Sequence, residues 1–105
     1  MQDFKRGTHV KIHDTICIVL ASRQDLIDRY QSEGARVTEN HVHGVGICDI
    51  EDQHKYMHLT IQEIHEHLMN SSGGVLYRRV ENLTEVDLDK LNKTMTHKLM
   101  KLEEE

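Results

Sequence analysis

A continuous apolar run, Ile16-Cys17-Ile18-Val19-Leu20-Ala21, is the sequence feature that most restricts how this chain can fold. A short run of this kind without a charged residue is typical of a strand that is buried on both faces. Ser22 follows at once and has the spacing of a capping box with Asp25, which starts a helix. A buried strand that leads directly into a helix predicts a domain with both α and β structure.

The rest of the chain predicts a succession of short elements. The first strand spans 8–21, is half exposed at its start, and has a break or bulge at Asp14-Thr15. The later elements that we expect are a helix over 23–33, two short strands within 35–50, a helix over 51–70, a strand over 75–80 and an amphipathic helix over 84–102. This order predicts an α+β fold, either ferredoxin-like (β-α-β-β-α-β) or an ACT-like sheet with two helices, plus an additional C-terminal helix.

Length and composition predict one small domain. We expect residues 1–105 to form a single domain with a loose N-terminus over 1–7. With no tryptophan and one phenylalanine, the core must be built from Ile, Leu, Val and Met, and a core of that size favours a homodimer.

Charge and cysteine content restrict the surroundings and the partners. The net charge of −5 with neutral histidines makes nucleic acid an unlikely partner, because such binding requires a basic surface. No apolar run approaches the roughly 20 residues that a membrane span requires. Two cysteines in a chain that begins at Met1 without a signal peptide predict a cytoplasmic protein.

Histidines supply the candidate site, because six of the nine lie within residues 41–67. In a helix over 51–70, His54 and His58 have the i, i+4 spacing that lets two imidazoles reach one metal ion. Further ligands would come from the preceding strands, and the candidates are His41, His43 and Cys48. Imidazole with thiolate suits a divalent transition metal, namely zinc, nickel, copper or iron.

Three short segments resemble known metal-binding families. The order His41, His43, Cys48 resembles the ligand-binding half of nickel-responsive repressors, an ACT-type domain in which a His-x-His pair precedes a cysteine ligand. His41-Val42-His43 is also similar to the metal motif of HUH single-strand endonucleases, which would imply Tyr56 as the nucleophile. The segment 46–55 looks like the first helix entry of hemerythrins, which would imply His54 as an iron ligand. Each resemblance implies metal binding through histidine.

These patterns predict a small cytosolic binding or regulatory domain that senses a transition-metal ion or a small ligand through the His/Cys cluster. Two other hypotheses stay open. One is a metal-dependent hydrolase or nuclease, with Asp49 or Asp52 as the base. The other is a protein-interaction module of the inhibitor or immunity type, in which a solvated or pH-sensing histidine stripe needs no metal.

Overall fold

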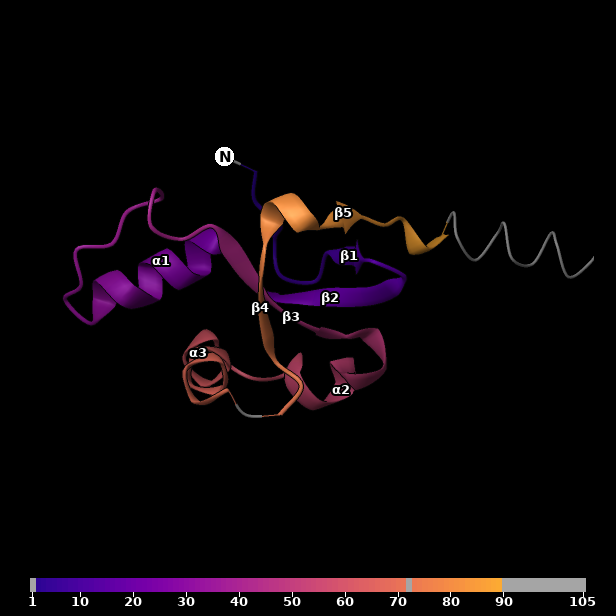
Figure 1. Ribbon diagram of the computed structural model, residues 1–105. Helices are drawn as coiled ribbons and strands as arrows, with labels where there is room; N and C mark the ends of the chain where they lie inside the picture. The colour runs from indigo at the N-terminus through magenta and orange to yellow at the C-terminus, as the bar shows by residue number, and fades with distance from the viewer. Residues whose placement is uncertain (1, 72, 90–105) are drawn as a thin grey trace, which may run out of the picture.

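The protein is an α+β domain built on one antiparallel sheet, as the computed structural model shows for residues 2–71 and 73–89 (Figure 1). The five strands have the order β4-β3-β2-β1-β5, and every neighbouring pair is antiparallel. The elements in chain order are β1 (His9–Ile12), β2 (Thr15–Ala21), α1 (Arg23–Ser32), β3 (Gly44–Asp49), η1 (Ile50–Asp52), α2 (Gln53–Tyr56), α3 (Ile61–Asn70), β4 (Leu76–Arg79), η2 (Val80–Asn82) and β5 (Thr84–Glu85). The predicted α+β class is therefore confirmed.

The element order departs from the predicted β-α-β-β-α-β succession in two places. The break predicted at Asp14-Thr15 is the end of a hairpin turn, in which His13 has a φ of 53° and the chain reverses from β1 to β2. Only one strand, β3, forms within 35–50, where we expected two. Residues 35–43 instead form an irregular segment, which the sequence did not distinguish from a strand.

The sheet separates two apolar cores, because alternate residues of a strand point to opposite faces. Ile18, Leu20 and Cys48 belong to the core under the helices. The opposite core is lined by Cys17, Val19, Val45 and Ile47 and is completed by Phe4, Val10, Val80 and Leu83. Figure 1 shows α2 and α3 on one side of the sheet and η2 on the other.

Helix α1 begins as the sequence predicts. The Ser22 hydroxyl accepts a hydrogen bond from Asp25 N at 3.0 Å, and the Asp25 carboxylate accepts one from Ser22 N at 3.0 Å. Each cap of this type contributes about 1 kcal/mol. Gly34, with a φ of 88°, follows the helix end in the left-handed conformation that favours glycine.

The N-terminal segment was expected to be loose, but it is held at both ends. The Asp3 carboxylate accepts hydrogen bonds from Arg23 N and Gln24 N at the start of α1. Phe4 is buried in the core opposite the helices, and Gly7 N donates to Val19 O at 2.8 Å. Hydrogen bonds of Asp3 and Gly7 and the buried ring of Phe4 together anchor this segment.

The prediction of one continuous helix over 51–70 is wrong, because the chain forms three separate helical segments there. The chain forms η1 and the short α2, leaves the helix after Tyr56, and starts again as α3. The second start has its own capping box: the Thr60 hydroxyl accepts from Glu63 N at 3.2 Å, and the Glu63 carboxylate accepts from Thr60 N at 3.1 Å. The predicted apolar stripe still reaches one core, because Met57, Ile61, Ile64 and Leu68 all belong to or pack against the core under the helices.

The amphipathic helix predicted over 84–102 falls largely outside the described residues. Thr84–Glu85 form β5, which pairs with β1, and residues 90–102 lie beyond the part that the structure describes. In the described ranges, no helix has the length and the apolar content that a membrane crossing requires.

Candidate functional site

The five predicted metal ligands do not form a metal site. Within residues 2–71 and 73–89, no group of three or more His, Cys, Asp or Glu side chains is placed to hold a metal ion. A structural or catalytic transition-metal site requires at least three such ligands. The donor set therefore does not fit a bound metal ion, and the reasons differ from residue to residue.

The two histidines of the His41-Val42-His43 motif point to different partners. His41 is exposed, and its Nδ1 accepts a hydrogen bond from Thr38 N at 3.1 Å. His43 is half-buried just before β3, and its backbone N donates to the Tyr77 hydroxyl at 3.1 Å. The His41 ring and the His43 backbone amide thus help to hold the segment between α1 and β3.

His54 and His58 lose the spacing that made them candidates. His54 is in α2, but this helix ends at Tyr56, so His58 lies beyond it on the connection to α3. Both side chains are exposed. Two histidines at i and i+4 share a face only in a continuous helix, and α2 ends between them at Tyr56.

Cys48 is a buried thiol of the core under the helices and has no accessible surface. Burial, with a smaller effect of the nearby Asp52 carboxylate, raises its pKa to about 11. The metal-binding and nucleophilic form of cysteine is the thiolate, so this residue is inert at neutral pH. Burial also raises the pKa of Cys17, on the opposite face of β2 and β3.

We expect both thiols to react slowly with a disulfide reagent at about pH 8 in the native protein and rapidly after unfolding. Because the folded pKa of Cys48 is about 11 and its ordinary value is 9.0, its contribution to stability is complete below about pH 9. That contribution is lost as the pH rises towards 11. Timed thiol titration with and without denaturant measures the first effect, and urea unfolding across this pH range measures the second. Fast native reaction at either cysteine would contradict their burial.

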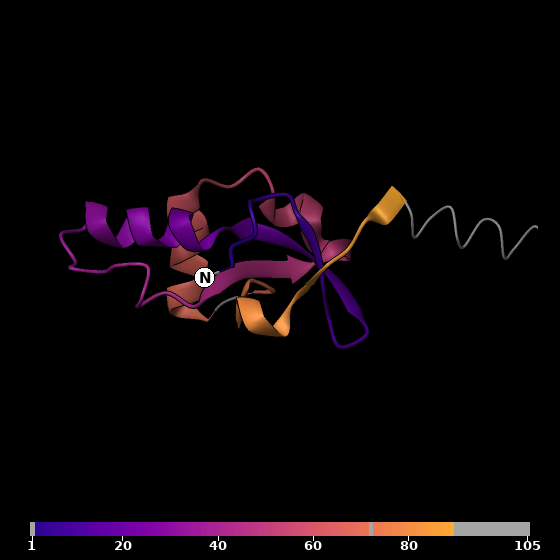
Figure 2. The ribbon, with the colours of Figure 1, turned by 90° about the horizontal axis from the view of Figure 1, so that it is seen from above.

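A mainly apolar cleft of about 300 Å³ lies where α1, α3, the segment after α1 and β4 meet. Its lining residues are Leu26, Tyr30, Val37, His41, Val42, Leu68, Met69 and Tyr77. Figure 2 shows α1 and the segment that follows it at one end of the sheet, next to α3. This volume and this apolar lining with a few polar groups are typical of small-molecule sites.

The wall formed by residues 35–43 is tied to α1 by side chains. Arg23, which is buried, donates from Nε to Val42 O at 2.6 Å and from Nη2 to Glu39 O at 2.5 Å. Gln31 donates from Nε2 to Val37 O at 2.8 Å. An irregular segment without strand or helix partners thereby acquires a defined position.

The polar side chains that line the cleft include His41, Tyr77 and Tyr30, and hydrogen bonds define the donors of the first two. The His41 Nδ1 accepts from Thr38 N, so the proton of the neutral ring is on Nε2 and is available to donate. The Tyr77 hydroxyl accepts from His43 N and keeps its own proton for donation.

A buried histidine stands behind the cleft. His65 is 6% exposed, and its Nε2 has no hydrogen-bond partner in the described part of the chain. Its ring packs edge-to-face against Tyr30, with centroids 4.8 Å apart, and it precedes Leu68 and Met69 by one turn of α3. A buried nitrogen without a hydrogen-bond partner lowers the stability of the fold by about 1–3 kcal/mol. Such unsatisfied groups in native proteins often have a functional role.

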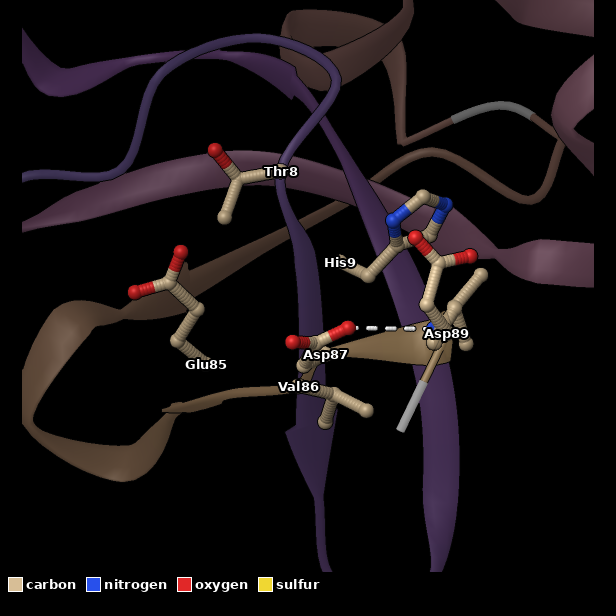
Figure 3. A pocket seen from close by; sticks show the side chains of 7 residues that line it. Thr8, His9, Glu85, Val86, Asp87 and Asp89 are labelled. Carbon is tan, nitrogen blue, oxygen red and sulfur yellow. Dashed lines mark hydrogen bonds between the residues drawn. The ribbon is translucent and has the colours of Figure 1, made fainter. Parts of the chain in front are cut away.

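A second hollow, of about 730 Å³, lies at the end of β1 and β5 and is shown in Figure 3. It is lined by Thr8, His9, Glu85, Val86, Asp87, Leu88 and Asp89, and the Asp87 carboxylate accepts a hydrogen bond from Asp89 N at 3.0 Å. Its three carboxylates are exposed to solvent, and its lining is mainly polar, whereas the lining of the cleft is mainly apolar. We therefore place the candidate site in the cleft.

Sequence reasoning singled out His41 as a metal ligand but missed the cleft, because its lining residues outside the His41-Val42-His43 segment belong to no motif. Tyr30 and Leu68 have the spacing of helix core residues, and Tyr77 falls in an ordinary strand pattern. Their convergence depends on the packing of α1 against α3, which no local pattern reports. A comparison of the chain with protein families, curated proteins and solved structures found no match in any of the three.

Proposed function

We propose that the protein is a small regulatory domain that binds an apolar organic ligand in the cleft between α1, α3 and β4. The observation that carries this proposal is a mainly apolar cleft whose lining includes the hydrogen-bonding side chains of His41 and Tyr77. Burial of apolar surface supplies the affinity, and the donors fix the orientation. The proposal keeps the ligand-sensing role expected from the sequence and replaces the metal with an organic molecule.

The ligand class follows from the lining. Aromatic and aliphatic side chains favour a flat or branched apolar body, and the two donors favour an oxygen acceptor at one end. An aromatic or branched carboxylic acid has both properties. Binding is favoured over catalysis, because the described residues that line the cleft include no carboxylate and no thiol or aliphatic hydroxyl nucleophile.

The protein-interaction hypothesis is the second candidate, and an exposed apolar surface beside the cleft supports it. Met69, which lines the cleft, is 64% exposed. A hydrolase or nuclease would need a bound metal ion beside Asp49 or Asp52. The nucleophile that the resemblance to HUH endonucleases implies is Tyr56, whose hydroxyl accepts a hydrogen bond from Gly74 N at 2.9 Å and whose ring packs against His67.

Titration with benzoate tests the proposed function. We expect benzoate, at about millimolar concentrations, to shift backbone amide signals of Val37, Val42 and Leu68 in heteronuclear NMR spectra. Benzylamine has the same ring but brings a cation in place of the acceptor, so we expect it to leave these signals unchanged. Shifts that are absent, or that are spread over both faces of the sheet, would contradict the proposal.

Tyr77→Phe is expected to weaken benzoate binding about tenfold, because one hydrogen bond to a charged group is lost. The substitution also removes the bond from His43 N, which costs the fold about 1 kcal/mol. Tyr56→Phe is a matched control, since it removes an equivalent bond from Gly74 N outside the cleft. We expect similar stability for both variants and weaker binding for Tyr77→Phe alone. Equal affinities would remove Tyr77 from the site.

A further inference from the structure

The outer edge of β4 is paired with no other strand in the described part of the chain, and the Tyr77 backbone oxygen accepts a hydrogen bond from the exposed Arg78 guanidinium at 2.8 Å. This strand is at the end of the sheet and is bonded to β3 alone. The large hydrophobic residues that are exposed within the described ranges are Met69, Leu76 and Tyr77, with exposed fractions of 64%, 42% and 42%. Two of them are on β4, and Met69 lines the same cleft as Tyr77. An apolar edge strand of this kind is a template for a further strand.

We propose that a second copy of this chain pairs its own β4 with β4 in antiparallel orientation. The two copies are related by a two-fold axis that passes between their Tyr77 residues. The five-stranded sheet then continues across the axis into the sheet of the second copy. This inference does not rest on the proposed ligand, because the paired surface is the backbone edge of β4. The edge is visible in Figure 1, where β4 crosses in front of β3.

The position of the axis follows from the faces of the strand. Opposite residues of an antiparallel pair share a face, and a two-fold axis perpendicular to the sheet preserves the faces. The axis must therefore pass between the two copies of one residue, which then lie opposite each other. Tyr77 and Arg78 are the central residues of β4, so an axis at either one pairs most of the strand. An axis at Arg78 would place two guanidinium groups opposite each other, which is unfavourable.

An axis at Tyr77 gives favourable neighbours. It pairs the two Tyr77 rings and places each Arg78 opposite Leu76 of the second copy, whose exposed apolar surface the arginine stem can cover. The arginines thus prevent other registers and permit this one. Charged edge residues usually protect a strand from unspecific pairing, and here they select a single partner geometry.

The charges at the two ends of β4 are complementary under this symmetry. With the axis at Tyr77, each Arg79 lies opposite Val75 of the second copy, next to Gly74. The Asp52 carboxylate lies there, 3.3 Å from the position that a Cβ would take at Gly74. Within one chain, Arg79 pairs with Glu81 at 2.9 Å and Asp52 pairs with Lys55 at 3.3 Å, so the new contact joins two existing ion pairs. Each dimer contains this Arg79–Asp52 contact twice.

Sedimentation of the full chain at increasing concentration tests the proposal. We expect the average mass to rise from 12.3 kDa towards twice that value. Arg79→Glu and Asp52→Arg should each weaken the self-association about tenfold, because each places like charges together at both contacts. A mixture of the two variants should recover association. In the mixed dimer the introduced carboxylate faces the introduced guanidinium, and the unchanged Arg79 faces the unchanged Asp52, so both contacts again join opposite charges.

Matched charge changes elsewhere serve as controls. Lys11→Glu on β1 and Asp28→Arg on α1 change exposed residues by the same charge and should leave self-association unchanged. Circular dichroism of every variant establishes that it is folded. A chain that stays at 12.3 kDa at every concentration would overturn the proposal. So would self-association that the charge variants leave unchanged, or that their mixture fails to recover.

Discussion

Gly44→Ala is expected to destabilise the protein by about 3 kcal/mol or more, enough to leave a substantial unfolded population. A Cβ at position 44 would lie 2.5 Å from the backbone oxygen of Arg78 and 2.7 Å from Cζ of Tyr77. The Tyr77 ring could rotate away, but the Arg78 carbonyl belongs to the paired strand, so β3 and β4 would have to separate. Urea unfolding followed by circular dichroism measures the loss.

Gly46→Ala is the control, because it makes the same change two residues further along β3. Its Cβ would meet Cδ1 of Leu68 at 3.3 Å, which is the end of a flexible side chain. Alanine is also favoured over glycine in a strand by about 0.5–1 kcal/mol, so we expect a net change near zero. Equal losses for the two variants would show that glycine is needed along β3 for a reason other than the contact with β4.

The elements that could be predicted from the sequence are those fixed by neighbouring residues. The apolar run that forms β2 lies in a strand buried from both sides, and the Ser22 capping box starts α1 at the expected residue. The turn after β1 was also indicated, by the break or bulge predicted at Asp14-Thr15. In each case the residues that predict the element lie within a few positions of the element itself, so tertiary packing did not override the local preference.

The candidate metal ligands are not gathered in the described part of the chain, because their predicted proximity depended on a longer-range assumption. His54 and His58 share a face only if the helix runs through residues 57–60, and Thr60 starts a new helix there. The Thr60 and Glu63 pair is visible in the sequence as a capping box, yet the apolar stripe continues through it in phase. Periodicity reports which side chains reach the core, and the two helices deliver them to the same core. It therefore cannot report the break.

The cleft is a different kind of omission. Its walls come from residues as far apart as Leu26 and Tyr77, and one wall is an irregular segment that has no strand or helix signal. That wall is positioned by Arg23, which is buried and donates to Val42 O. The side chain of this arginine bonds to backbone carbonyl oxygens that are distant in the sequence. Only the structure can therefore reveal its role.

Arg23→Met is expected to cost about 3 kcal/mol and to release the wall of the cleft. Methionine keeps the apolar stem but removes both charge-assisted hydrogen bonds, so the oxygens of Val42 and Glu39 lose their partner. Amide hydrogen exchange should accelerate over residues 37–42 more than the change in global stability explains. Benzoate affinity should fall about tenfold or more, because Val37, His41 and Val42 no longer hold their positions.

Arg6→Met separates the effect on the wall from a general loss of stability. Arg6 has the same chemistry at another place: its Nη2 donates to Met57 O and to Leu59 O, at 2.5 and 2.6 Å, on the connection between α2 and α3. We expect a comparable loss of stability, faster exchange over 57–60, and unchanged benzoate affinity, because none of these residues lines the cleft. If both variants lose affinity equally, binding depends on global stability and not on the wall. If Arg23→Met leaves exchange over 37–42 unchanged, other contacts position that segment, and Gln31, which bonds to Val37 O, becomes the residue to test.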